Sequence, residues 1–436
     1  MKVLVVGRGG REHAIAWKLS LSPHVERVYI APGNGGTSLI GENIDIDTIE
    51  VVRLSEFARD IGVGLVVVGP ELPLSLGLAD ELKSLGVPAF GPTRLAAQIE
   101  ASKAFAKEFM SRHDIPTAPF EIAESIPQVE HALKKIGTPC VIKADGLAAG
   151  KGAFIVETKE DALKVAEHLI EKRVLGDAGK RVVVEAFLSG IEVSFQVITD
   201  GYRILPLATS QDFKRAYDND EGPNTGGMGA YSPAFFMTSD LLHEVIQRIM
   251  KPAIQGLESE GRVYTGVLYA GLMLTSEGPK VLEFNCRLGD PETQVVLPRL
   301  ETDFAEICEA TVKGELNRIV ARWSRSSCLC VVLASGGYPG KYEKGYPIEG
   351  LEDILSMEDV VVFHAGTKRG EDGQFYTDGG RVLNVVAMGP TLKHARERAY
   401  HAIEKIKFEN MHYRKDIGEK AIKMIESVAK EMKKES

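Results

Sequence analysis

A glycine- and lysine-rich segment between two apolar runs constrains the fold of this chain more than any other feature. Residues 143–152 hold three glycines and two lysines, and the flanking apolar runs 140–142 and 153–157 predict strands. The segment is then the tip of a hairpin, whose glycines let backbone N–H groups approach an anion and whose lysines supply charge. Gly152 follows Lys151 and no helix comes next, so this is not a Walker A loop. We interpret it as a flap over a polyphosphate; a surface hairpin with solvated lysines is the alternative.

The bulk composition excludes several classes of function. The 436 residues are 44% hydrophobic and 26% charged, which is typical of a globular protein with several domains. A net charge of −9 leaves no basic excess for DNA or RNA, so we expect no nucleic-acid partner. The five cysteines lack zinc-site spacing and predict buried thiols in a reducing compartment. The chain begins with an apparent strand, and no apolar run reaches the ~18 residues that span a bilayer. We predict a cytoplasmic protein without a membrane partner.

The first hundred residues alternate apolar strands with helices, which predicts a parallel sheet with ligands at the carboxyl ends of its strands. The glycine turn at residues 7–10 lies between a strand and a helix and predicts an anion site at the helix N-terminus. It is similar to a dinucleotide-binding turn, but no acidic residue ends the second strand, at residues 25–30. An NAD-dependent oxidoreductase is therefore a weaker alternative than an enzyme that binds a phosphate-bearing small molecule. Glu71 follows the next strand, at the same edge.

A predicted strand at residues 281–285 carries the clearest metal-binding pattern. Side chains alternate along a strand, so Glu283 and Asn285 share a face while the apolar residues between them pack behind. A carboxylate and an amide oxygen on one face can share Mg²⁺ with water and nucleotide phosphates. Arg287 continues the same alternation and places a cation beside the metal. A polar pair without a metal is the alternative.

Two further segments are candidates for ligand contacts. Residues 181–188 form a strand that runs out toward Glu192, which suits an adenine edge and a ribose, although a strand that simply reaches solvent fits as well. Residues 210–231 form a long, polar, glycine-dense stretch with Lys214 and Asn224, which indicates a functional loop rather than a linker. Residues 314–327 are the expected linker to a final region of strands and one long helix.

Several of these motifs together carry a resemblance to a known family. Residues 7–12, 143–152, 222–231, 283–292, 334–340 and 379–383 occur in the order found in the phosphoribosylamine–glycine ligase (glycinamide ribonucleotide synthetase) family of the ATP-grasp superfamily. The chain resembles this family over nearly its whole length. The resemblance implies an α/β and α+β multidomain fold. It comprises an N-terminal parallel α/β domain at 1–100, an ATP-grasp domain at 101–313 with a flap at about 117–188, and a small C-terminal mixed α/β domain at 328–425.

The resemblance also implies a reaction and a set of site residues. ATP, with Mg²⁺ or Mn²⁺, would activate glycine as glycyl phosphate, which 5-phosphoribosylamine then attacks to give glycinamide ribonucleotide, ADP and phosphate. The implied metal ligands are Glu283 and Asn285, and the implied catalytic residues are Arg287, Lys214 and Asn224. The implied nucleotide contacts are Lys103, Lys143, Gly150, Lys151, Gly152, Glu185, Ala186, Phe187, Leu188 and Glu192. The implied substrate contacts are Gly9, Gly10, Glu71, Asp212, Gly227, Met228, Asp290, Pro291, Glu292 and Arg381. A monomer is expected.

Two departures from the family pattern bear on these implications. Arg8 stands where family members commonly carry a small residue, which puts the detail of the first phosphate site in doubt. Residues 266–271 contain no acid, so a second metal ion would depend on phosphates and water. Another ATP-grasp ligase with a different carboxylate and amine is the main alternative. A nucleotide-binding regulator without catalytic activity is a further one, opposed by the combination of metal pair, arginine and flap lysines.

Overall fold

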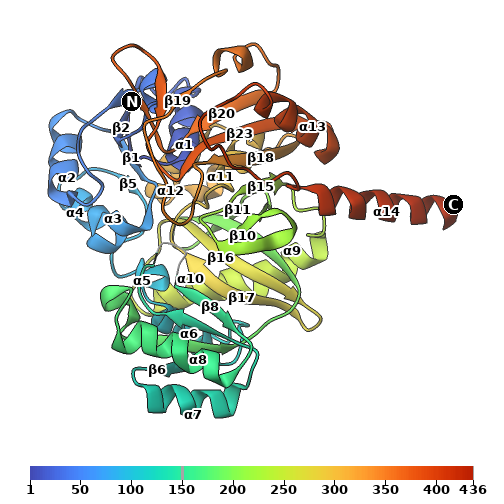
Figure 1. Ribbon diagram of the computed structural model, residues 1–436. Helices are drawn as coiled ribbons and strands as arrows, with labels where there is room; N and C mark the ends of the chain where they lie inside the picture. The colour runs from blue at the N-terminus through green and yellow to red at the C-terminus, as the bar shows by residue number, and fades with distance from the viewer. Residues whose placement is uncertain (149–151, 436) are drawn as a thin grey trace.

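The computed structural model describes residues 1–148 and 152–435. The N-terminal part of the chain forms a parallel sheet (Figure 1). Its strand order is β3-β2-β1-β4-β5, so both neighbours of the buried strand β1 are parallel to it. The strands are β1 (Lys2–Gly7), β2 (Arg27–Pro32), β3 (Glu42–Asn43), β4 (Leu65–Val68) and β5 (Ala89–Phe90). The connecting helices are α1 (Gly10–Ser20), α2 (Val51–Asp60), α3 (Glu71–Leu76) and α4 (Leu78–Ser84). The carboxyl ends of β1 and β4 therefore bring the first glycine turn and Glu71 to one edge, as parallel pairing requires.

The second unit is an antiparallel sheet of order β6-β9-β7-β8 that carries the glycine-rich hairpin. Its strands are β6 (Phe120–Ala123), β7 (Cys140–Ala144), β8 (Ala153–Val156) and β9 (Val182–Ala186), and its helices are α7 (Ile126–Ile136) and α8 (Lys159–Ala166). Helices α5 (Gln98–Ala101) and α6 (Lys103–Arg112) precede it. One face of the sheet packs on α7 and α8 through a separate small core. The predicted hairpin is present, since β7 pairs with β8 from Cys140 to Lys143.

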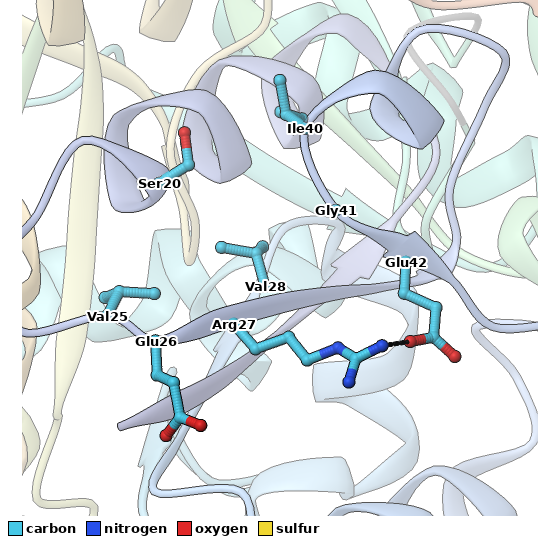
Figure 2. Close-up of a pocket in the computed structure, with 8 residues that line it drawn as sticks. All are labelled: Ser20, Val25, Glu26, Arg27, Val28, Ile40, Gly41 and Glu42. Atoms are coloured by element: carbon cyan, nitrogen blue, oxygen red, sulfur yellow. Dashed lines mark hydrogen bonds and ion pairs between the residues drawn. The ribbon is translucent and has the colours of Figure 1, made fainter.

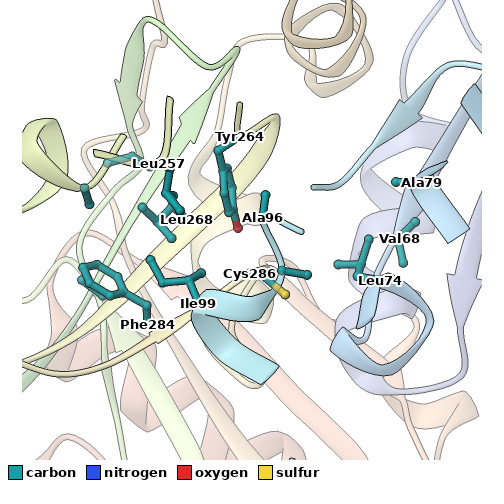
Figure 3. Packing of buried hydrophobic residues seen from close by; sticks show 14 of the residues in the cluster. Val68, Leu74, Ala79, Ala96, Ile99, Leu257, Tyr264, Leu268, Phe284 and Cys286 are labelled. Carbon is teal, nitrogen blue, oxygen red and sulfur yellow. The ribbon is translucent and has the colours of Figure 1, made fainter. Parts of the chain in front are cut away.

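The third unit places the predicted metal strand at the edge of a sheet of order β11-β10-β16-β17. Its strands are β10 (Ile191–Thr199), β11 (Ile204–Pro206), β16 (Gly266–Thr275) and β17 (Gly278–Asn285), all antiparallel, with helices α9 (Ser239–Val245) and α10 (Lys251–Ser259). Figure 3 shows side chains of this sheet and of the N-terminal unit in one buried cluster: Phe284 and Leu268 lie on one side, and Val68 of β4 and Leu74 of α3 on the other. This shared core holds the two sheets in a fixed relation.

The C-terminal sheet has the order β12-β15-β18-β23-β20 and contains strands from two distant parts of the chain. Strands β12 (Gln211–Asp212) and β15 (Gly229–Ser232) come from the polar glycine-dense stretch; β18 (Ser327–Ala334), β20 (Val360–His364) and β23 (Arg381–Gly389) come from the C-terminal region, with α13 (Leu392–Ile403) packed on them. This sheet therefore includes strands from both sides of residue 328. The polar stretch is anchored by backbone pairing, which sequence patterns did not reveal.

The remaining elements connect or flank these sheets. They are β13 (Arg215–Tyr217), β14 (Glu221–Asn224), β19 (Pro347–Ile348), β21 (Thr367–Arg369), β22 (Phe375–Thr377), α11 (Thr293–Val296), α12 (Phe304–Val312) and α14 (Glu419–Glu435). Short 3-10 or π turns occupy Thr37–Leu39, Glu167–Glu171, Gly176–Gly179, Asp218–Asp220, Ile246–Met250, Leu297–Arg299, Leu316–Arg318 and Glu352–Ile354. Helix α14 projects from the body of the molecule (Figure 1). Among the described helices, none combines the length and apolar character needed to cross a membrane.

Candidate active site

Glu283 and Asn285 lie on one face of β17, as the alternation predicts, while Phe284 between them is buried in the core. Glu283 pairs with Gly271 of β16, where an added Cβ would lie 3.4 Å from the Glu283 side chain. This would be an ordinary van der Waals contact, so the fit of Glu283 does not require glycine at this position. Burial by itself would raise the pKa of Glu283, but four cations outweigh it and hold that pKa below its ordinary value. These cations are Lys214, Lys143, Lys103 and Arg287.

Lys143 of β7 reaches β17 through a buried group of charges. Its ammonium pairs with Glu185 of β9 and donates a hydrogen bond to the Leu282 carbonyl over 3.0 Å. Glu185 also pairs with Lys107 of α6, and both partners of that pair are buried. Burial opposes the charge on Glu185, but Lys143 and Lys107 lower its pKa below the ordinary value. The Glu185 carboxylate is thus committed to two lysines.

Lys103 begins helix α6 at the base of the flap. Its ammonium lies 3.3 Å from the Gly146 carbonyl, and its backbone N–H donates to the Asp145 carbonyl over 2.9 Å. The Asp145 carboxylate accepts from the Ala104 N–H over 2.7 Å and pairs with Arg181 at 2.7 Å. Asp145 therefore ties the helix start to the end of β7, which brings Lys103 and the flap hairpin together.

Arg287 continues from β17 into a set of acidic partners. Its guanidinium donates to Asn285 Oδ1 over 3.2 Å and pairs with Glu71 at 3.3 Å and Glu100 at 3.2 Å. Glu100 is itself fixed, because the Cys286 N–H donates to it over 2.6 Å. Burial raises the pKa of Glu100, and Arg287 opposes that rise. A cation placed in this way is held rigidly beside the predicted metal pair.

Asp212 at the end of β12 and Lys214, which lies between β12 and β13, belong to the same region. The Lys214 ammonium pairs with Glu192 of β10 and lies 4.0 Å from the Asp212 carboxylate. Burial raises the pKa of Asp212 to about 7; Lys214 opposes this shift, while Glu292 and Glu192 add to it. Asp212, Glu192 and Lys214, which are spread over 22 residues of sequence, thus form one charged group.

The segment that follows Arg287 is linked to the C-terminal sheet. Arg381 pairs with the Asp290 carboxylate at 2.8 Å and donates to the Gly226 carbonyl over 2.6 Å. Gly227 has a φ of +112°, and a Cβ there would lie 2.4 Å from Pro291. Only glycine allows this approach, so the polar stretch and the segment from Asp290 pack directly together.

The Glu292 side chain is buried, and its carboxylate is hydrogen-bonded to other side chains of the protein. Its Oε1 atom accepts from the Tyr269 hydroxyl over 2.6 Å and from Ser194 Oγ at 3.0 Å, and the residue is 3% exposed. Met228 is fully buried and takes part in the backbone pairing of the polar stretch. Asn224 is half-buried in β14, opposite Arg215. Their assignment as site residues stays a prediction.

The first glycine turn is filled by the protein itself. The Gly9 N–H donates to Glu12 Oε2 over 2.7 Å, and a Cβ on Gly69 would lie 2.1 Å from Glu12 Oε1. Gly10 lies against β23, where a Cβ would lie 2.1 Å from the Asn384 amide. The Gly9 N–H, which would otherwise meet an anion, is thus already hydrogen-bonded to Glu12. At Gly10 and Gly69, close packing leaves no space for a Cβ.

The other predicted nucleotide contacts lie at the ends of flap strands. Ala186 ends β9, and Phe187 beyond it is 40% exposed beside Leu188, as expected for a strand that runs toward a ligand or solvent. The Gly152 carbonyl accepts from the Ala144 N–H over 2.8 Å. Gly150 and Lys151 lie outside the described residues.

The sequence interpretation missed two residues of this region, Glu100 and Lys107. Glu100 gave no local signal, because its partners are almost two hundred residues away in sequence (Cys286 is 186 residues distant). Lys107 did give one: it stands four residues after Lys103 on one helix, and such residues share a face.

A surface pocket of about 450 Å³ lies elsewhere, at the outer edge of the N-terminal sheet. Figure 2 shows it between the end of α1 and the strands β2 and β3, with Arg27 and Glu42 paired across its rim at 2.5 Å. None of the described site residues lines it. The candidate site is therefore defined by its convergent charges and not by this pocket.

Comparisons with known proteins agree with this architecture. Three family models match in succession: Phosphoribosylglycinamide synthetase N domain at residues 1–100, its ATP-grasp (A) domain at 101–293 and its C domain at 328–420. A phosphoribosylamine–glycine ligase from Caldanaerobacter subterraneus is 50% identical over 418 residues, 96% of this chain and 99% of that protein. One from Escherichia coli O157:H7 is 49% identical over 425 residues, covering 97% of this chain and 99% of that protein.

Solved structures give the same result at two levels of similarity. The crystal structure of phosphoribosylamine–glycine ligase from Thermotoga maritima matches with a TM-score of 0.85 and 35% identity, covering 96% of this chain and all (100%) of that one. A biotin carboxylase domain from Hydrogenobacter thermophilus matches with a TM-score of 0.73 at 18% identity, covering 94% and 91%, and so supports the fold alone.

The fold, in which the flap sheet contacts β17 through Lys143, is that of an ATP-grasp ligase. Enzymes of this class use ATP together with a divalent metal ion. Within the class, the chain belongs to the phosphoribosylamine–glycine ligase family, whose members act in de novo purine biosynthesis. The resemblance stated from the sequence is thereby confirmed.

Proposed function

We propose that the predicted site residues carry out ATP-dependent ligation of glycine to 5-phosphoribosylamine through glycyl phosphate. The observation that supports this most directly is the environment of Glu283. Its carboxylate shares a strand face with Asn285 and is surrounded by the cations of the flap and its base, of the segment after β12 and of the segment after β17. Phosphoryl transfer needs alignment and charge neutralisation rather than a protein nucleophile, and this arrangement provides both.

The donor set at β17 fits a hard divalent cation. Glu283 supplies a carboxylate and Asn285 supplies an amide oxygen on the same strand face. We propose that these two residues hold Mg²⁺ or Mn²⁺, whose contribution is to neutralise charge on the nucleotide phosphates. Lys103 and Lys143 are placed to bind those phosphates from the flap side, and the flap excludes water from the reactive acyl phosphate.

The ligation then proceeds in two steps, a phosphoryl transfer and an acyl transfer. A glycine carboxylate oxygen attacks the γ-phosphorus of ATP, and ADP leaves. The amine of phosphoribosylamine attacks the carbonyl carbon of glycyl phosphate, inorganic phosphate leaves, and the nitrogen loses a proton. Arg287 would orient the glycine carboxylate or the transferred phosphoryl group. Lys214, paired with Glu192, would neutralise charge from the opposite side.

The phosphoribosylamine side would lie where the N-terminal and C-terminal sheets approach the central one. Glu71, Asp290 and Arg381 converge there, and the Asp290–Arg381 ion pair links the segment after β17 to β23. Arg381 could bind a phosphate, and the acidic residues could bind ribose hydroxyls or the amine. The proposed domains, 1–100, 101–313 and 328–425, thus meet at one site.

The test is phosphate release from Mg-ATP with glycine, with and without freshly generated phosphoribosylamine. Release that requires both, with glycinamide ribonucleotide formed in equal amount, supports the proposal. Turnover with a different carboxylate or amine would leave the ATP-grasp assignment standing and replace the substrates. Nucleotide binding without turnover for any pair would favour a regulator.

Two further properties are proposed with it. All five cysteines are buried and free of disulfides, which supports a cytoplasmic location. We also propose a monomer, which sedimentation at several protein concentrations would test; a mass that rises to twice the chain mass of 47.5 kDa would contradict it.

A further inference from the structure

A buried group of charges behind the flap joins three elements of the proposed nucleotide site. Glu185 stands at its centre, and its two carboxylate oxygens pair with Lys143 on one side and with Lys107 on the other. All three side chains are less than a tenth exposed. Two ammonium groups and one carboxylate give the group a net charge of +1. Without Lys107, the net charge of the group would be zero.

The same group is hydrogen-bonded to two consecutive backbone carbonyls of β17. Lys143 donates to the Leu282 carbonyl over 3.0 Å. Lys107 donates to Thr117 Oγ1 over 2.7 Å, and that hydroxyl donates onward to the Val281 carbonyl over 2.7 Å. Both carbonyls lie immediately before Glu283. The charge group therefore connects the flap strands, helix α6 and β17 in one network.

Lys143 has a limited number of donors to share. An ammonium carries three N–H groups, of which Lys143 uses one on Glu185 and one on Leu282. Among the residues that the structure describes, no third partner takes the remaining N–H group, and we assign it to a phosphate oxygen. If Lys107 were absent, the full charge of Glu185 would fall on Lys143, giving a neutral pair in a buried setting, where Coulomb attraction is strong.

We propose that Lys107 is a positioning residue for ATP: by sharing the charge of Glu185, it keeps the Lys143 ammonium available to the nucleotide phosphates. Lys107 is 2% exposed and does not itself face the ligand. The inference rests on the proposed function, because it assumes that Lys143 binds the nucleotide.

The first experiment compares Lys107→Met with the wild-type enzyme. We expect the KM for ATP and the Kd of Mg-ADP to rise about 10-fold, which matches the coupling found within such networks, while the KM for glycine is unchanged. Lys134→Met, at an exposed lysine on α7 of the same flap, is the matched control and should leave both constants unchanged. A folded Lys107→Met protein with wild-type ATP KM and nucleotide Kd would overturn the proposal.

A double-mutant cycle separates positioning from general destabilisation. Once Glu185 is neutral, Lys107 has no charge to share, so Glu185→Gln and Lys107→Met/Glu185→Gln should bind Mg-ADP within about 2-fold of each other. A further loss of about 10-fold in the double variant would contradict the mechanism. This comparison also serves if Lys107→Met alone does not fold, because neither protein contains the buried carboxylate.

Direct measurement of nucleotide binding separates a failure of the proposed function from a failure of the proposed role of Lys107. If the wild-type protein binds Mg-ADP but does not ligate glycine to phosphoribosylamine, the proposed function fails and the role of Lys107 is still decided by the binding constants. If the wild-type protein binds no nucleotide, both fail together.

Discussion

Two charged regions of this chain, the first glycine turn and the site at β17, have opposite electrostatics. The turn at residues 7–10 is occupied by Glu12, whose carboxylate caps helix α1 and pairs with Arg11 at 2.5 Å. The site at β17 has the reverse arrangement, with one carboxylate, Glu283, surrounded by cations from several elements. The difference shows that glycines alone do not make an anion site. The protein must also supply positive charge there that its own carboxylates do not neutralise.

The largest expected effect is at β17. Glu283→Ala should lower kcat by at least about 10³-fold, because it removes the carboxylate of the proposed metal pair, while the fold stays intact. Glycine- and phosphoribosylamine-dependent phosphate release measures the rate, and circular dichroism measures the fold. Glu277→Ala, in the exposed turn before β17, is the control and should retain activity. Near-normal turnover in Glu283→Ala would remove the metal assignment.

The first turn should respond in stability instead. Glu12→Ala removes the cap of α1 and leaves Arg11 buried without its charge partner, so we expect the free energy of unfolding to fall by about 3 kcal/mol or more. Urea unfolding gives this value. Glu42→Ala breaks the exposed pair with Arg27 and should cost less than about 1 kcal/mol. An unchanged stability with a raised KM for phosphoribosylamine would instead make the turn a substrate site.

Two histidines beside this turn predict a pH dependence of stability. Burial, with a smaller contribution from His364, lowers the pKa of His13 to about 3, and burial lowers that of His364 to about 4. The unfolded chain binds protons first as the pH falls below about 6.5, so stability should drop from pH 7 to pH 5 by about 2 kcal/mol for each histidine.

Urea unfolding at the two pH values checks this dependence. The difference between pH 7 and pH 5 should shrink in His364→Gln and stay unchanged in His401→Gln, whose side chain is 63% exposed. An equal difference in His364→Gln and wild type would show that the buried histidines do not carry the effect.

The smallest effect is expected at Arg8, the residue that departs from the family pattern. Its side chain is 58% exposed and pairs with Asp378 at 3.3 Å. Exposed pairs contribute little, so Arg8→Asn should change the free energy of unfolding by less than about 0.5 kcal/mol. A larger loss, reproduced in Asp378→Asn, would show that this pair fastens the N-terminal and C-terminal regions together.

The sequence by itself determined the local parts of this protein. Strand alternation placed Glu283 and Asn285 on one face, and glycines between apolar runs placed a hairpin after β7. These features depend on neighbours within a few residues, so periodicity and turn chemistry suffice to predict them. The family resemblance, spread over the whole chain, added the reaction.

Only the tertiary structure decided which charges meet. Arg287 finds Glu71 and Glu100, Lys107 finds Glu185, and strands β12 and β15 join the C-terminal sheet, all across long separations in sequence. Such contacts follow from how whole sheets pack through shared cores, and no local pattern records them. Whether a glycine turn holds an anion or the protein's own carboxylate is settled at that level, because burial and the surrounding charges set the energy of each ion.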